Sequence, residues 1–205
     1  MKLYYSPGAC SLSPHIVARE AGLPVELRKV DLRAKLVEGS ADYLKTNGKG
    51  YVPCIELPDG SVLTEGPAIV QYLADQKPDA GLAPKAGSME RYRLQEWLNF
   101  ITSELHKAFG AFFNPGITPE WRKATEDRLV LRCEWLAKQL EGKDYLMGKQ
   151  FTVADAYLFT VLGWGKYVNV DLAPWPGLLG YLGRVAARPA VQAALAAEGL
   201  IPTSK

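Results

Sequence analysis

The chain has 205 residues, of which 48% are apolar and 22% charged. This composition is typical of a globular protein and excludes disorder over most of the chain. A net charge of +2 is too small to indicate a nucleic-acid-binding protein. The first residues lack the apolar run of a signal peptide, and no segment approaches the ~20 apolar residues of a membrane helix. The sequence therefore predicts a cytoplasmic protein that binds neither nucleic acid nor a membrane.

The cysteines and histidines are few and lack the spacing of a structural framework. Cys10, Cys54 and Cys133 show no recognisable pattern, and an odd number argues against a set of disulfides. The two histidines, His15 and His106, are too few for a His-rich metal site. We expect neither a bound metal nor a tightly bound cofactor.

A change of composition divides the chain near residue 80. Residues 77–87 contain two Pro and two Gly, which interrupt helical structure. All five Trp and all six Phe lie at residue 97 or later. The predicted domains are residues 1–77 and 88–205, joined by a linker over residues 78–87.

The first part alternates between strand and helix patterns. Strands are predicted at 2–5, 25–31, 54–57 and 61–64, the last two joined by an Asp-Gly turn as a hairpin. A helix is predicted from Ser13-Pro14 to Gly22, a short one between residues 31 and 54, and another from Gly66-Pro67. This order predicts an α/β thioredoxin-like domain.

The second part has helical patterns throughout, which predicts an all-α domain. A long helix is predicted from its cap Ser88 to about Phe113, and another begins at Thr118-Pro119-Glu120. Thr152-Val153-Ala154-Asp155 is a capping-box variant. Residues 156–162 behind it are apolar nearly all round and predict the buried centre of a bundle, with two further helices at 177–187 and 189–197.

Cys10 lies between the first strand and the first helix. A helix N-terminus favours a thiolate, so Cys10 is a candidate reactive thiol; a buried, inert cysteine is the alternative. Ser13 stands where a C-x-x-C motif would have its second cysteine, which excludes a two-cysteine redox cycle within this motif.

Two further places suggest a binding site for a peptide-like ligand. In a thioredoxin-like domain, Val52-Pro53 is the position of a cis proline, which exposes the backbone of the preceding residue to an extended peptide. Glu65-Gly66 begins a helix, where backbone N–H groups bind a carboxylate and Glu65 can pair with an ammonium group. An ordinary trans proline and a plain helix start remain the alternatives.

Asn99, Ser103, His106 and Gly110 form one polar stripe on the long predicted helix. Such a stripe is either a solvated face or the wall of a polar cleft. Phe109, Phe113 and Trp164 are candidates for an apolar pocket or for core positions.

Together these features resemble the glutathione transferase family over essentially the whole chain. Cys10 with His106 is similar to the bacterial beta class, which has a cysteine where most other classes have a catalytic Tyr or Ser. The resemblance implies catalytic roles for Cys10 and His106, and a cytoplasmic homodimer that conjugates glutathione, as co-substrate, to small apolar electrophiles. It implies glutathione contacts from Ala9, Cys10, Lys35, Val52, Pro53, Glu65, Gly66, Asn99, Ser103, Glu104, His106 and Lys107, those from Asn99, Ser103 and Glu104 being made to the other subunit's glutathione. It also implies that Phe109, Phe113 and Trp164 line the pocket for the co-substrate.

Gly66 departs from the family pattern, which often has Ser there, so a hydroxyl donor to glutathione is missing. Three alternative functions stay open. The first is a glutathione-dependent thiol–disulfide reductase or peroxidase that uses Cys10. The second is a non-catalytic binding or regulatory protein of this architecture, like bacterial stringent-starvation proteins or translation-factor subunits, and the third is passive carriage of apolar ligands.

Overall fold

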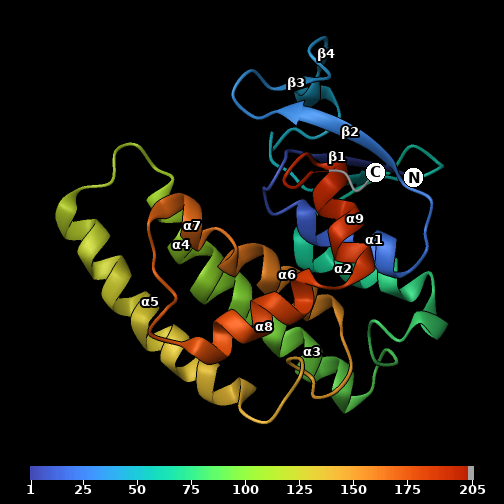
Figure 1. Ribbon diagram of the computed structural model, residues 1–205. Helices are drawn as coiled ribbons and strands as arrows, with labels where there is room; N and C mark the ends of the chain where they lie inside the picture. The colour runs from blue at the N-terminus through green and yellow to red at the C-terminus, as the bar shows by residue number, and fades with distance from the viewer. Residues whose placement is uncertain (203–205) are drawn as a thin grey trace. The chain divides into compact units, whose positions relative to one another are not determined.

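The computed structural model describes residues 1–202, which form two compact units (Figure 1). The first unit comprises Met1–Ala83 and the segment from Ala187 onward, and the second comprises Pro84–Ala186. The division between Ala83 and Pro84 falls within the linker that the sequence predicts over residues 78–87. The segment from Ala187 onward differs, because the sequence assigns all of residues 88–205 to the helical domain. The reason is that the last helix, α9 (Pro189–Ala197), packs against α1 (Leu12–Glu20) of the first unit (Figure 1).

The first unit is built on a six-stranded mixed sheet with the strand order β4-β3-β2-β1-β5-β6. The central strand β1 runs parallel to β2, with Leu3 opposite Leu27, and antiparallel to β5, with Leu3 opposite Ile55. This is the thioredoxin-like arrangement that the sequence predicts. The strands are β1 (Lys2–Tyr5), β2 (Glu26–Asp31), β3 (Leu36–Val37), β4 (Ala41–Asp42), β5 (Cys54–Glu56) and β6 (Val62–Thr64).

Helices α1 and α2 (Gly66–Asp75) pack together beside this sheet. The sequence predicts that α1 starts at Ser13-Pro14, but it starts at Leu12, so Pro14 is its third residue. Proline is tolerated there because the first N–H groups of a helix have no intrahelical partner. Two short 3₁₀ turns, η1 (Tyr43–Lys45) and η2 (Pro78–Ala80), complete the unit.

The stretch between β2 and β5 contains β3, β4 and η1, where the sequence predicts only a short helix. Strands of two residues show no alternation of apolar and polar positions, so no pattern reveals them. The Asp42 side chain caps η1 by accepting a hydrogen bond from the Leu44 N–H (2.9 Å).

The second unit is helical, as predicted. Its elements are α3 (Met89–Phe100), the π-helical turn η3 (Ile101–His106), α4 (Lys107–Phe112), α5 (Pro119–Leu140), α6 (Val153–Leu162), α7 (Gly165–Val168) and α8 (Pro176–Ala186). Two of the predicted caps are confirmed: the Ser88 hydroxyl accepts from the Arg91 N–H and the Thr118 hydroxyl from the Trp121 N–H, each at 3.2 Å. The four-residue α7 is too short to leave a periodic signal.

Helix α6 is the buried centre of this unit, as predicted, with only Phe159 not fully buried. Its capping box is present: the Asp155 carboxylate accepts hydrogen bonds from the Thr152 N–H (2.8 Å) and hydroxyl (3.0 Å). The Leu146 N–H and the Tyr181 hydroxyl also donate to Asp155. Among residues 1–202, no helix has the length and apolarity needed to cross a membrane.

Candidate functional site

Cys10 lies in the turn that leads from β1 into α1. Its carbonyl accepts hydrogen bonds from the Ser13 hydroxyl (2.8 Å) and the Ser13 N–H (3.2 Å), while the Ala9 N–H bonds to the Ser6 carbonyl (3.0 Å). Cys10 as a whole residue is partly exposed, and its thiol donates to the Val52 carbonyl oxygen at 3.1 Å. Two places that are far apart in the sequence are thus joined by one contact.

The surroundings of Cys10 favour the protonated thiol, whereas the sequence leaves open a thiolate at the helix start and a buried cysteine. Burial raises the pKa of Cys10 to about 12, and the backbone N–H groups of Cys10 and Ser11 oppose this only in part. Cys10 precedes Ser11, the N-cap of α1, so it lies outside the first helical turn, where the helix dipole acts most strongly. Its hydrogen bond to a carbonyl oxygen also requires the proton, because a carbonyl only accepts.

The start of α2 lies against the same place. The Val52–Pro53 peptide is cis, as predicted, and both residues are buried. A Cβ added at Gly66, the first residue of α2, would lie 3.8 Å from Cγ of Pro53. Cys10, Val52, Pro53 and Gly66 therefore converge within the first unit.

Glu65, directly before Gly66, is the N-cap of α2 and has a positive φ of 72°. Its side chain is exposed and forms an ion pair with Lys49 (Nζ to Oε1, 2.6 Å). Lys49 Nζ also donates to the Thr64 hydroxyl (3.1 Å). The sequence suggests that Glu65 can pair with an ammonium group of a ligand. In the structure the Lys49 ammonium already occupies this place.

Lys35 lies in the loop between β2 and β3, with a positive φ of 59°. Its Nζ donates to the Gly50 carbonyl (2.9 Å) and lies 5.7 Å from the centre of the Tyr51 ring. The Lys35 ammonium therefore contacts Gly50, which lies two residues before Val52 in the chain.

His106 belongs to an aromatic cluster of the second unit. Its Nδ1 is 2.5 Å from the Tyr157 hydroxyl, and its ring packs edge-on against Trp164, with 4.8 Å between centroids. Phe113 also packs edge-on against Trp164, with 5.9 Å between centroids. Burial lowers the pKa of His106, so the imidazole is neutral at neutral pH.

The residues of the predicted polar stripe differ in exposure. Asn99 and Ser103 are exposed and linked to each other through the Ser103 hydroxyl and the Asn99 carbonyl (2.9 Å), Gly110 is exposed too, and His106 is partly buried. The π-helical turn η3 lies within this stripe, and a π-helical turn has a wider residue spacing than an α-helix.

Glu104 and Lys107 border a surface cavity of about 430 Å³ between η3, α4 and α5, which Ser103 and Trp121 also line. The Glu104 carboxylate accepts from Arg128 (3.0 Å) and Arg132 (2.6 Å), which hold its pKa below the ordinary value. Lys107 is exposed.

The three aromatic pocket candidates differ in exposure. Phe113 is 52% exposed and Trp164 is 7% exposed. Phe109 is fully buried, so in this structure it is a core residue and lines no open surface.

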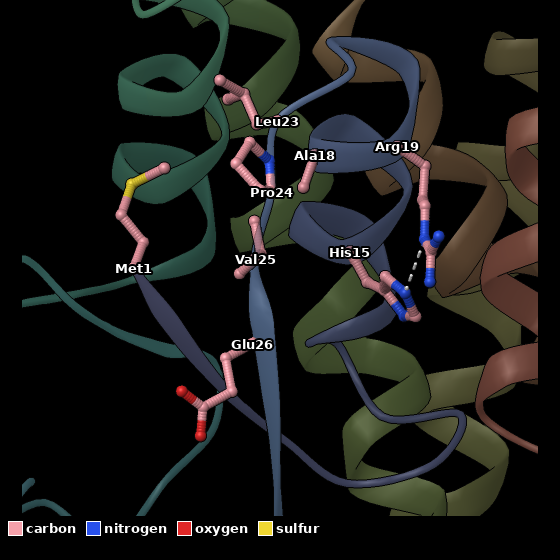
Figure 2. Close-up of a pocket in the computed structure, with 8 residues that line it drawn as sticks. All are labelled: Met1, His15, Ala18, Arg19, Leu23, Pro24, Val25 and Glu26. Carbon is pink, nitrogen blue, oxygen red and sulfur yellow. Dashed lines mark hydrogen bonds between the residues drawn. The ribbon is translucent and has the colours of Figure 1, made fainter.

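The first unit also has a cavity, and none of the candidate site residues lines it. It has a volume of about 580 Å³ and is lined by Met1, His15, Ala18, Arg19, Leu23, Pro24, Val25 and Glu26 (Figure 2). Figure 2 shows Arg19 beside His15, to whose Nε2 it donates a hydrogen bond of 3.4 Å. Neither Cys10 nor Val52 lines this cavity.

Sequence reasoning missed several residues that contact the candidates. Tyr157 lies within an almost wholly apolar helix. Its hydroxyl, which contacts His106, was the one feature of the sequence that could have indicated a polar contact there. Lys49 lies in a Gly-rich loop that carries no periodic pattern, and its ion pair with Glu65 depends on how that loop folds. Tyr43 and Asn47, considered below, lie in the stretch whose structure the sequence did not reveal.

The fold and the convergent thiol, proline and helix start define a thioredoxin-like unit with a candidate site for a thiol-containing peptide, followed by a helical unit. Comparison with known proteins agrees. Residues 8–76 match the family model "Glutathione S-transferase, N-terminal domain" and residues 119–184 match "Glutathione S-transferase, C-terminal domain".

Relatives cover nearly the whole chain. Glutathione S-transferase GstA of Escherichia coli O157:H7 is 45% identical over 98% of this chain and 100% of its own. The structure of BphK, a bacterial glutathione S-transferase in a ternary complex, is 61% identical over 97% and 100% of the two chains, with a TM-score of 0.95. Two sphingomonad structures are each 49% identical over 98% and 100%, with a TM-score of 0.94; one contains glutathione and the other, from Sphingomonas chungbukensis, is described as beta class. The chain belongs to the glutathione S-transferase family, in its bacterial beta class.

Proposed function

We propose that the protein conjugates reduced glutathione to small apolar electrophiles, using the first unit to hold the tripeptide. The observation that carries the proposal is the convergence of Cys10, Val52 and the start of α2. In the reaction, the glutathione thiol loses its proton to solvent water, its sulfur forms a bond to an electrophilic carbon, and the leaving group, where there is one, departs with its electron pair.

The protonated Cys10 thiol is suited to stabilise the glutathione sulfur rather than to attack the substrate itself. A thiol that carries its proton donates a hydrogen bond to a neighbouring thiolate. In the structure this proton goes to the Val52 carbonyl at 3.1 Å, so Cys10 changes its acceptor when glutathione binds. The free Val52 carbonyl and N–H then pair with the backbone of the glutathione cysteine.

The two ends of glutathione fit the charges around this centre. Glu65 accepts the γ-glutamyl ammonium, after Lys49 has left it, and the N–H groups at the start of α2 bind the γ-glutamyl carboxylate. Lys35, which lies over Tyr51, binds the glycine carboxylate. Ala9 and Pro53 complete the apolar surroundings of the sulfur.

We further propose a homodimer, as the resemblance implies. The second unit has exposed apolar side chains on α3 and α5, with Met89 65%, Leu131 60% and Trp135 43% exposed, and Trp135 packs on Trp97 of α3 (5.5 Å between centroids). Burial of such side chains would stabilise a second copy of the chain. In that dimer Asn99, Ser103 and Glu104 contact the partner's glutathione, with Lys107 adding positive charge beside them. Sedimentation velocity tests this: Leu131→Glu should shift the protein toward monomer, and an unchanged sedimentation coefficient would contradict it.

The co-substrate pocket and the role of His106 remain part of the proposal. Phe113 and Trp164, together with the neutral His106, offer an apolar and weakly polar surface for an electrophile. Their support is the aromatic cluster itself. A cytoplasmic location likewise remains a prediction.

Calorimetric titration with reduced glutathione tests the function. We expect one site per chain, with a dissociation constant between micromolar and millimolar, and binding also of ophthalmate, which lacks the thiol. Conjugation of an aryl halide should require glutathione and should not occur with ophthalmate. Glu65→Gln should weaken binding of both ligands about tenfold, since a charge-assisted hydrogen bond is lost. Absence of any binding heat would refute the proposal and favour a non-catalytic protein.

The reductase alternative requires Cys10 as the nucleophile. A thiol whose pKa is about 12 is almost wholly protonated at neutral pH, and only the thiolate attacks a disulfide. Cys10→Ser separates the two functions: conjugation should fall but persist, because the glutathione thiol is the nucleophile, whereas a reductase would lose all activity.

A further inference from the structure

The carbonyl group of Tyr51, one residue before Val52, accepts two hydrogen bonds from buried side chains. The Tyr43 hydroxyl donates at 2.7 Å and the Asn47 side-chain amide donates at 2.8 Å. Tyr43 is fully buried and Asn47 is 5% exposed, although the Tyr51 side chain itself is exposed. A carbonyl oxygen has two lone pairs, and here both are used.

Tyr43 is held rigidly where it makes this bond. Its ring lies in a core cluster with Val52 and Cys54 and packs 5.5 Å from the ring of Tyr4. Burial raises the pKa of Tyr43 well beyond the physiological range, so its hydroxyl keeps the proton that it donates. Moving the Tyr51 carbonyl would require either breaking this bond or shifting the core.

Tyr43 and Asn47 also connect the neighbouring loops of the candidate site. The Tyr43 N–H donates to the Lys35 carbonyl (2.9 Å). The Asn47 side-chain oxygen accepts from the Lys49 N–H (3.1 Å), and its carbonyl accepts from the Gly50 N–H (2.8 Å). Lys35 and Lys49, whose ammonium groups contact Gly50 and Glu65, are thus joined through their backbones to the two residues that hold Tyr51.

We propose that Tyr43 and Asn47 are positioning residues for glutathione. They fix the Tyr51 carbonyl, and with it the peptide plane that carries the Val52 N–H, so that the Val52 backbone meets the cysteinyl part of the tripeptide at hydrogen-bond distance. Neither side chain touches the ligand. The proposal rests on the proposed function, because it assigns these residues to the site where glutathione pairs with Val52.

The test compares Tyr43→Phe with Tyr4→Phe. Tyr4 lies in the same core cluster, is equally an aromatic residue in the sheet region, and donates its hydroxyl to Glu56 (2.6 Å) rather than to the candidate site. Tyr4→Phe therefore controls for the loss of a buried hydroxyl. We expect Tyr43→Phe to raise KM for glutathione roughly three- to tenfold, with little change in kcat or in KM for the electrophile, and Tyr4→Phe to leave all three unchanged.

Asn47→Ala should raise KM for glutathione in the same way. The variant that combines Tyr43→Phe with Asn47→Ala should have a higher KM than either single variant. Hydrogen exchange supplies a readout that needs no ligand: peptides covering residues 50–54 should exchange faster in Tyr43→Phe than in Tyr4→Phe. If wild-type protein binds glutathione while Tyr43→Phe and Tyr4→Phe have the same KM and exchange, the positioning role is wrong and the proposed function stands. If wild-type protein fails to bind glutathione, the proposed function fails, and the positioning role fails with it.

Discussion

Cys10 should react slowly with alkylating agents at neutral pH, because burial raises its pKa to about 12. The rate of carbamidomethylation by iodoacetamide should rise steadily with pH up to about pH 10 without a plateau, as the thiolate fraction grows. Mass spectrometry of the labelled peptide checks this. Cys10→Ser is the control, since Cys54 and Cys133 are fully buried. A plateau below pH 8 would show a stabilised thiolate and would revive the reductase function.

Gly66→Ser should tighten glutathione binding about tenfold by restoring a hydroxyl donor to a charged group. The structure has room for it: the φ of Gly66 is not in the left-handed region, and an added Cβ meets only Cγ of Pro53 at an ordinary 3.8 Å. Gly66→Ala is the matched control, because it adds the Cβ without the hydroxyl. Equal dissociation constants for the two variants, measured by calorimetry, would show that the hydroxyl makes no contact with the ligand.

At the scale of single elements, α6 depends on one carboxylate. Asp155 accepts from the Thr152 N–H and hydroxyl, the Leu146 N–H and the Tyr181 hydroxyl, all in the interior. Asp155→Ala leaves these donors without an acceptor, at a cost of about 1–3 kcal/mol for each one that stays buried. We expect a lower denaturant midpoint by circular dichroism, far below that of Thr152→Ser, which keeps its hydroxyl. An Asp155→Ala midpoint equal to that of Thr152→Ser would contradict the stabilising role of the Asp155 carboxylate.

The elements that the sequence predicts correctly are those with a strong local signal. The Asp59-Gly60 turn, the Ser88 cap and the all-apolar α6 each depend on residues close together in the chain. Strands β3 and β4 and helix α7 are too short for any period to appear. The π-helical turn at residues 101–106 changes the residue spacing of the helix without any marker in the sequence.

The candidate site was predictable in part for the same reason. Cys10, Pro53 and Glu65 follow or begin elements that the sequence predicts, so their placement follows from the fold. Tyr43 and Asn47 act through side-chain hydrogen bonds to a carbonyl on a separate loop, and no spacing rule relates them to Tyr51.

For the whole molecule, the main departure from prediction is that α9 belongs to the first unit. Glu198, just after α9, is buried and accepts hydrogen bonds from the Gly8 N–H (2.9 Å) and from His15 Nδ1 (2.9 Å). Arg188, just before α9, pairs with Glu20 at the end of α1 (2.6 Å). Contacts between residues 168 or more positions apart cannot be read from local patterns.

Glu198→Ala should destabilise the first unit more than a surface substitution would. It removes the carboxylate that accepts from the Gly8 N–H and His15 Nδ1, and a buried donor that loses its acceptor costs about 1–3 kcal/mol. Because Gly8 lies two residues before Cys10, glutathione binding should weaken as well. Thermal unfolding with and without glutathione checks both effects. The melting temperature of Glu198→Gln, which keeps one acceptor oxygen, should lie between those of the wild-type protein and Glu198→Ala. A wild-type melting temperature for Glu198→Ala would contradict the role of this contact.

The attachment of α9 to α1 has a consequence for how the protein is made. A ribosome synthesises the chain from Met1 onward, so α1 leaves it long before α9 does, and all of residues 84–186 are made in between. The second unit, a continuous segment, can fold as soon as it emerges. The thioredoxin-like unit must wait, with the surface of α1 that packs against α9 uncovered, until α9 is released. A premature stop codon before α9 would therefore damage the half of the protein that was translated first.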